Sequence, residues 1–311
     1  MSPAQTRSAK TRSSASGQEA PAKARKVENG APNTKDTPPK PEILETGILD
    51  YFIRARVGIE DPKNVDDIAR GYLVLRPLRQ DTDLTKRPLP DSLTSRLLAM
   101  PKKHLPQSSS DRFMAFVDEP GLSYSELASG FLASREYETK TMGERHVPSA
   151  TPVGEGVYAI TASGSESHLV YISTLPESKG EFQQSLGLQQ RGSFIICTKN
   201  PKFKSPPYAK LPEAPEYPKS ILDELGSYRW VPVKPEHLNY KNAQILLIGH
   251  NDGKRLVKGD QERSVPVEDK LESLEEEDFK GMRHLSSDES EAIYADLHTK
   301  AKKYHDLPDH F

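Results

Sequence analysis

Alternating hydrophobic and polar positions run through the middle of the chain. Residues 49–57 (LDYFIRARV) alternate with a period of two, which is typical of a β-strand with one buried face. Apolar runs of similar length predict further strands at 72–75, 96–100, 157–161, 169–175, 193–199 and 244–249. The run RFMAFV at 112–117 is the most continuously apolar, so we predict a central strand there, buried on both faces.

Helix signals are fewer and shorter. Ser123 with Glu126 forms a capping-box pattern, which predicts the start of a helix. Two more short helices are indicated before Gly187 and Gly226, since glycine is the residue that most often ends a helix. The pattern therefore predicts an α+β fold that is strand-rich, with a mostly antiparallel sheet or sheets and a few short helices.

The order of these elements repeats. Residues 72–77 parallel residues 169–174, and residues 96–100 parallel residues 193–197, both at an offset of 97. This indicates one pseudo-duplicated domain at 43–253 with halves at about 43–140 and 150–253. Chance similarity between short strands is the alternative explanation.

The two ends of the chain differ from this body. Residues 1–42 hold no Ile, Leu, Phe, Tyr or Trp, and residues 1–41 carry eight basic against three acidic side chains, so we predict a disordered basic tail. Residues 254–311 carry ten basic and fifteen acidic side chains. There we expect an acidic linker around 275–278, followed by an isolated helix at about 286–306 that could dock on the body or on another protein.

Charge and cysteine content narrow the classes of partner and compartment. The body holds 25 basic and 27 acidic residues, which argues against nucleic-acid binding through it. The basic cluster Lys23–Lys26 leaves a weak nucleic-acid or nuclear-import contact open, or simply a solubilising tail. One cysteine, no membrane-length apolar run and no secretory signal pattern predict a nuclear or cytoplasmic protein without membrane contact.

The stretch 137–160 (YETKTMGERHVPSATPVGEGVYAI) is the best candidate for a binding site. Cationic side chains in a loop can bind an anion where glycines let the backbone approach it closely, and neighbouring strand ends could add further polar groups. The candidate ligand-binding residues are Lys140, Arg145, His146, Gly154, Gly156, His168, Lys199 and Asn200. The alternative is that the cations are solvated and the glycines serve turns.

Enzyme signatures are missing. The chain has no phosphate-loop sequence, no G-x-S-x-G elbow and no complete dinucleotide fingerprint. A single cysteine and scattered histidines argue against a zinc site. We therefore predict no cofactor and no metal, assign no catalytic residue, and lean against an enzyme.

Several long blocks of the body, which span about 43–250, resemble a known family. They are GILDYFIRARVGI, DIARGYLVLRP, LLAMPKKHLP, DRFMAFVDEP, residues 137–160 and RGSFIICTKNP. They are similar to fungal proteins labelled "BTB domain transcription factor" and to their uncharacterised bacterial and plant relatives. The resemblance implies a regulatory or protein-interaction role in the nucleus or cytoplasm, with protein partners. The strand-dominated pattern predicts a fold other than the mainly helical BTB fold. A module or enzyme that binds a small anionic ligand near 137–160 is the alternative function.

Overall fold

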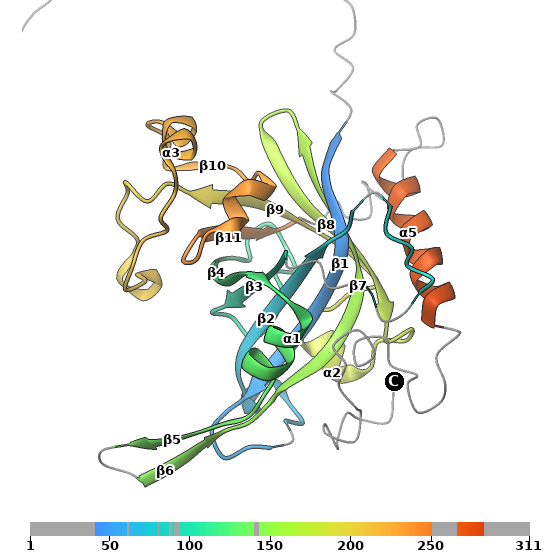
Figure 1. The fold of residues 1–311 in the computed structure, drawn as a ribbon, viewed down its shortest axis with the longest axis vertical. Coiled ribbons are helices and arrows are strands. Elements are labelled where there is room, and N and C mark those ends of the chain that lie inside the picture. Colours follow the sequence, from blue (N-terminus) through green and yellow to red (C-terminus); the bar gives the residue numbers. More distant parts are fainter. Residues whose placement is uncertain are drawn as a thin grey trace, which may run out of the picture. The chain divides into compact units, whose positions relative to one another are not determined.

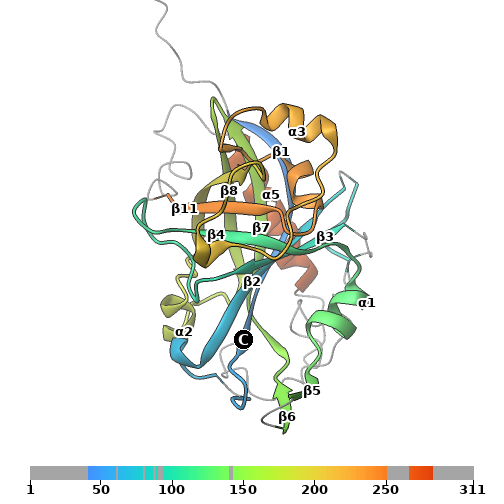
Figure 2. The same ribbon diagram turned by 90° about the vertical axis from the view of Figure 1, so that its left-hand side faces the viewer.

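Eight antiparallel strands close into a β-barrel (Figures 1 and 2). The computed structural model describes residues 41–60, 62–79, 81–86, 89, 94–139, 143–250 and 266–282. Within them the strands pair in the order β10-β9-β11-β4-β3-β2-β1-β7-β8, and the further pairing of β8 with β9 closes the ring. The barrel strands are β1 (Glu42–Ala55), β2 (Ile68–Pro77), β3 (Ser95–Met100), β4 (Arg112–Leu122), β7 (Ala150–Ser163), β8 (Glu166–Leu175), β9 (Arg191–Lys199) and β11 (Gln244–Gly249).

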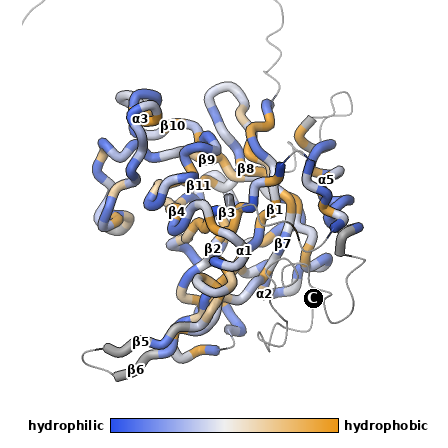
Figure 3. The backbone as a smooth tube through the Cα atoms, viewed as in Figure 1, coloured by the Kyte–Doolittle hydropathy of each residue, from blue (hydrophilic) through white to orange (hydrophobic). Residues whose placement is uncertain are grey.

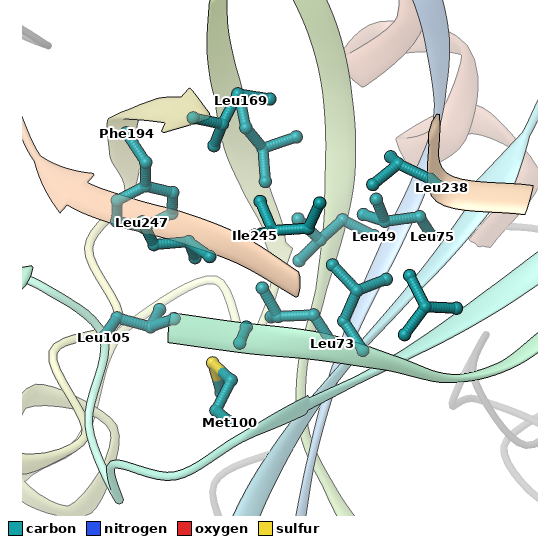
Figure 4. Packing of buried hydrophobic residues seen from close by; sticks show 14 of the residues in the cluster. Leu49, Leu73, Leu75, Met100, Leu105, Leu169, Phe194, Leu238, Ile245 and Leu247 are labelled. Atoms are coloured by element: carbon teal, nitrogen blue, oxygen red, sulfur yellow. The ribbon is translucent and has the colours of Figure 1, made fainter. Parts of the chain in front are cut away.

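The period of two in the sequence separates the inside of the barrel from its outside. Leu49, Tyr51 and Ile53 of β1 belong to the interior cluster, whereas Ile48 and Phe52 belong to a second, outer cluster. Figure 4 shows interior side chains from different strands converging, and Figure 3 shows hydrophobic positions spread along the barrel strands. The outer face is also largely buried, because helices and loops cover part of it.

Large side chains fill the space over inward-facing glycines. A Cβ at Gly47 would lie 2.5 Å from Tyr158 Cε1, and one at Gly192 would lie 2.3 Å from Tyr171 Cε1. Both distances are far below van der Waals contact. The two rings therefore occupy the volume that other side chains would take, and the interior is packed as a core.

Short segments cover both ends of the barrel. At the end where β9 stops, the chain forms η3 (Pro207–Ala209), α3 (Lys219–Leu225), β10 (Trp230–Pro232) and η4 (Pro235–Asn239). Leu225 and Leu238 from this cap join the interior cluster. At the other end lie η1 (Val65–Asp67) and α2 (Glu181–Ser185), and Leu186 and Leu188 after α2 complete the core there.

The predicted helix boundaries are confirmed. The Ser123 amide donates to Glu126 Oε2 at 2.8 Å and the Glu126 amide donates to Ser123 Oγ at 3.1 Å, which is the expected capping box. It precedes α1 (Tyr124–Glu126) and η2 (Leu127–Phe131), a short π-helix. Gly187 and Gly226 have φ of 77° and 52° after α2 and α3, a conformation that favours glycine.

The strand order has an internal two-fold arrangement. The meanders β1-β2-β3-β4 and β7-β8-β9-β11 meet twice, at β1–β7 and at β4–β11. At the β1–β7 meeting, Gly47 pairs with Tyr158 and Tyr51 pairs with Gly154. A glycine of β1 therefore faces a tyrosine of β7, and a tyrosine of β1 faces a glycine of β7. Such reciprocity is what a duplication would produce, and it is consistent with the two predicted halves.

The predicted offset of 97 between the halves is wrong by one residue. It aligns inward-facing Leu73 with Val170, which faces outward. An offset of 96 aligns Leu73 with Leu169 and Leu98 with Phe194, and all four belong to the interior cluster. A shift of one residue exchanges the two faces of a strand. Of the two offsets, only 96 therefore aligns inward-facing positions with inward-facing positions.

Other features also differ from the sequence-based expectation. The strand-rich, antiparallel character with few helices is confirmed, but we expected a sheet or sheets and the structure closes into a barrel. Strand β4 buries only one face: Phe113, Ala115 and Val117 are buried while Met114 and Phe116 are half-buried. Most of the expected loop at 137–160 is β-structure, namely β5 (Arg135–Thr139), β6 (Gly143–Val147) and the first part of β7.

The expected acidic linker around 275–278 is part of a helix, α5 (Pro266–Met282). Val267, Leu271 and Leu274 form a stripe at helical spacing, and they pack on the outside of the barrel with Val157 of β7 and Val170 of β8. Burial of this stripe offsets the poor helix tendency of an acidic sequence. Residues 1–40 of the tail predicted at 1–42 lie outside the described residues, as does the predicted helix at 286–306, whereas Glu42 already belongs to β1.

Candidate functional site

The predicted anion-binding residues lie on different elements. Lys140 lies outside the described residues. Arg145 and His146 belong to β6, which pairs only with β5 in the described part of the chain. The His146 Nδ1 atom lies 3.9 Å from Glu136 Oε1 across the hairpin. This pair of strands leads away from the barrel (Figure 1).

Gly154 and Gly156 belong to the barrel wall. A Cβ at Gly154 would lie 2.6 Å from Leu188 Cδ2, and one at Gly156 would lie 2.3 Å from the Ile172 carbonyl oxygen. Their role in the structure is close packing within β7, where the sequence had suggested a flexible loop. Gly154 and His168 also lie at opposite ends of the β7–β8 pair.

The remaining three predicted residues lie near the end of the barrel that η3, α3, β10 and η4 cover, which we call the capped end. The His168 ring lies 5.4 Å from the His250 ring, and burial, followed by the charge on His250, lowers the His168 pKa. Lys199 donates to the Phe203 carbonyl at 2.5 Å. Asn200 Nδ2 lies within bonding distance of three carbonyls at or just after the C-terminal end of α3, the nearest being Tyr228 at 3.0 Å. Asn200 therefore holds the cap in place, and anion binding by these residues stays a prediction.

A polar network that the sequence analysis did not assign lies inside the capped end. Arg96 donates through Nη1 to Glu45 Oε1 at 2.7 Å and through Nε to Asn239 Oδ1 at 2.8 Å. Tyr158 donates to the same Glu45 oxygen at 2.8 Å. Burial, followed by the Glu45 charge, raises the Tyr158 pKa well above its usual value, so the phenol stays a donor. The sequence held one signal for this network: in the predicted strand at 96–100, Arg96 lies on the same face as Leu98, which is the inward face of β3.

The cap contributes a buried histidine to the same end. His237 Nδ1 accepts the Lys234 amide at 3.2 Å and lies 2.9 Å from Thr198 Oγ1. Its Nε2 atom lies 3.9 Å from Glu224 Oε1 and has no hydrogen-bond partner among the described residues. Burial lowers the His237 pKa, and the Glu224 charge opposes that shift. The ring is therefore neutral near pH 7.

The order Thr198, His237, Glu224 superficially resembles a nucleophile, a base and an orienting acid. Both Thr198 and His237 have zero relative exposure, however, so substrate cannot reach the hydroxyl. Arg96 and His237 are buried at this end of the barrel, and each binds η4 to a barrel strand: Arg96 of β3 bonds Asn239, and His237 lies beside Thr198 of β9. We conclude that they position the cap and do not form an exposed reactive centre.

The opposite end has an open pocket of about 560 Å³ between η1 and α2. Val65 and Phe182 supply its apolar lining, and Lys63, Asn64, Asp66, Asp67, Glu181 and Ser185 supply the polar part. Asp67 Oδ2 already accepts the Lys63 and Asn64 amides. With three carboxylates and one lysine, this lining does not match the anionic ligand that the sequence suggested.

A buried ion pair lies on the outer face of the barrel. Arg76 Nε lies 2.7 Å from Asp50 Oδ2, and Nη2 lies 3.2 Å from Asp50 Oδ1. Glu155 Oε2 lies 3.9 Å from Arg76 Nη2. All three side chains are almost fully buried, so the pair joins β1, β2 and β7 where solvent does not screen it.

The β5–β6 hairpin is fixed to the barrel at its base. Arg54 of β1 donates through Nη1 to the Pro148 carbonyl at 2.6 Å and through Nη2 to the Phe131 carbonyl. Its guanidinium also lies 5.4 Å from the centre of the Phe131 ring. Phe131 and Pro148 flank the hairpin in the chain, so one side chain holds both of its ends.

Comparison of the chain with protein-family models, curated proteins and solved structures finds no match. Among the described residues, no group of three or more His, Cys, Asp or Glu side chains is placed to hold a metal ion. No described helix is both long and apolar enough to cross a bilayer.

Proposed function

We propose that the protein is a protein-interaction module with a regulatory role in the nucleus or cytoplasm, as the family resemblance implies. The barrel serves as a rigid scaffold, and partners bind to its outside. The observation that carries this proposal is the packing of the interior: tyrosine rings and leucines pack inside it, and short segments lie over both ends, with the pocket between η1 and α2 at one of them. Barrels that carry small ligands need an interior cavity or an open mouth instead.

The β5–β6 hairpin is the proposed contact element. In the described part of the chain these two strands form a sheet of their own, so each has a backbone edge that does not pair with the other. Unpaired strand edges bind extended segments of other proteins by β-augmentation. Because Arg54 fixes both ends of the hairpin, less conformational freedom is lost on binding than for a free loop.

Photo-crosslinking tests this proposal. Glu136 on β5 has a 68% exposed side chain, and Lys86, far from the hairpin in sequence, is 84% exposed. Glu136→p-benzoylphenylalanine in the full chain, irradiated in cells, is expected to give a protein adduct of defined mass. Lys86→p-benzoylphenylalanine is the matched control and is expected to give none.

Two results count against the proposal. If neither position gives an adduct, or if both give the same adducts, the hairpin is not a specific contact element. Exclusion of the full chain from the nucleus in imaging would remove the nuclear form of the role and leave the cytoplasmic one.

A further inference from the structure

The outer face of β7 and β8 is covered by α5, a helix that is intrinsically unfavourable in water. Seven of its seventeen residues are acidic. Glu272 and Glu276 are four residues apart, where like charges destabilise a helix. Glu275, Glu276, Glu277 and Asp278 lie in its C-terminal half, where negative charge opposes the helix dipole. The helix therefore depends on its contact with the barrel.

That contact has a simple pattern. Val267, Leu271 and Leu274 occupy one stripe of α5 and belong to one buried cluster with Val157 and Ala159 of β7 and Val170 and Ile172 of β8, and α5 contacts both strands. Asp278 continues the stripe by one helical turn and is also fully buried. Among the side chains of α5 that the structure describes, Val267, Leu271 and Leu274 form the apolar part of the interface.

Two cations on the barrel side complement the acidic flank. Arg191 of β9 donates through Nη2 to Glu272 Oε1 at 3.1 Å. Lys179, before α2, interacts electrostatically with Glu275. The face therefore recognises both the apolar stripe and acidic residues beside it, which is helix-in-groove recognition with added charge specificity.

We propose that this face is a binding site for an acidic amphipathic helix of another protein, and that α5 occupies it in cis until such a helix displaces it. The partner helix carries apolar residues at spacings of four and three, as at 267, 271 and 274, with a carboxylate at the position of Glu272. This site is separate from the β5–β6 hairpin, so either one can fail its test without the other.

A labelled synthetic peptide of residues 266–282 serves as the probe, with fluorescence anisotropy as the measurement. The wild-type full chain should bind it weakly, because its own α5 competes at high effective concentration. The full-chain variant L271D/L274D should bind the wild-type peptide at least about tenfold more tightly, because its own helix no longer docks. A peptide carrying the same two substitutions should not bind.

Charge reversal tests the specificity. R191E, made in the L271D/L274D chain, should weaken binding of the wild-type peptide, and a peptide with Glu272→Arg should recover it. A merely apolar interaction would not respond to this exchange. Hydrogen exchange of the wild-type chain gives a second readout that needs no variant: α5 amides should exchange faster than those of β1 and β7.

Three results overturn the proposal. The first is no peptide binding by an L271D/L274D chain whose barrel unfolds at the wild-type urea midpoint. The second, which also covers a variant that fails to fold, is α5 exchange as slow as that of β1. The third is dimerisation of the wild-type chain that L271D/L274D abolishes, since a second copy's α5 would then be the occupant.

Discussion

Replacing Gly47 by alanine tests the claim that the barrel interior is filled. The new Cβ would lie 2.3 Å from the Arg76 carbonyl oxygen and 2.5 Å from Tyr158 Cε1, about 1 Å inside normal contact. The carbonyl belongs to the β1–β2 ladder and the ring is fully buried, so neither can move freely.

The expected cost follows from these two contacts. Overpacking of a dense core costs about 1–3 kcal/mol. Displacing the Tyr158 ring also strains its hydrogen bond to Glu45, and bonds to charged groups contribute about 1.5–3 kcal/mol. Replacing glycine by alanine within a strand offsets about 0.5–1 kcal/mol of this cost, because glycine loses more backbone freedom on folding. We therefore expect the free energy of unfolding to fall by roughly 2–4 kcal/mol, a large share of the usual total.

Urea unfolding followed by circular dichroism measures this change. Gly130→Ala is the matched control, because a Cβ there meets nothing within 4 Å, and it should be neutral or slightly stabilising. Adding Tyr158→Leu to Gly47→Ala should recover part of the Gly47→Ala loss, since leucine lacks the clashing ring atom. An unchanged urea midpoint for Gly47→Ala would refute the filled interior.

Three further predictions concern the titratable groups. Arg96→Met should destabilise the fold by about 3–5 kcal/mol because it leaves Glu45, whose side chain is only 12% exposed, without its cation, and Tyr158→Phe by only about 1.5–3 kcal/mol; equal urea midpoints for the two variants would contradict the network. Because burial lowers the His237 pKa below the unfolded value of 6.5, the neutral ring contributes stability that is present above pH 6.5 and is lost as pH falls through the folded pKa. His237→Gln should therefore flatten the pH dependence of the urea midpoint below pH 6.5, with the remainder due to groups such as His168. Burial also lowers the Lys179 pKa to about 8 while Glu275 opposes the shift, so acetylation at pH 8 followed by mass spectrometry should modify Lys179 faster in Glu275→Gln than in the wild type.

Most barrel strands could be predicted from the sequence because each has a local period of two. Closure of the barrel could not be predicted. The β1–β7 pairing joins segments that are distant in the chain, and no local pattern indicates that β8 pairs with β9. Repeated strands in the sequence suggested two halves, but short apolar runs do not say which face of a strand is inward. The offset error of one residue follows from that ambiguity.

The candidate residues were harder to predict than the fold. Gly154 and Gly156 suggested a flexible loop, although glycine equally serves close packing inside a strand, and the structure uses them so. Asn200 suggested a ligand contact, whereas its amide bonds carbonyls at the C-terminal end of α3 and just after it, which are 25 residues or more away. The helix α5 could not be predicted because acidic residues surround its three apolar positions. Those positions stabilise the helix only by packing on the barrel surface.

The central claim is that partners bind outside a filled barrel, and hydrogen exchange tests it most directly. The full chain is compared alone and together with the partner that the Glu136 crosslink identifies. We predict that exchange slows in residues 135–147, while residues 71–75 and 96–100, which lie within the barrel wall, do not change. Protection confined to the two ends of the barrel, with none in the hairpin, would contradict the account.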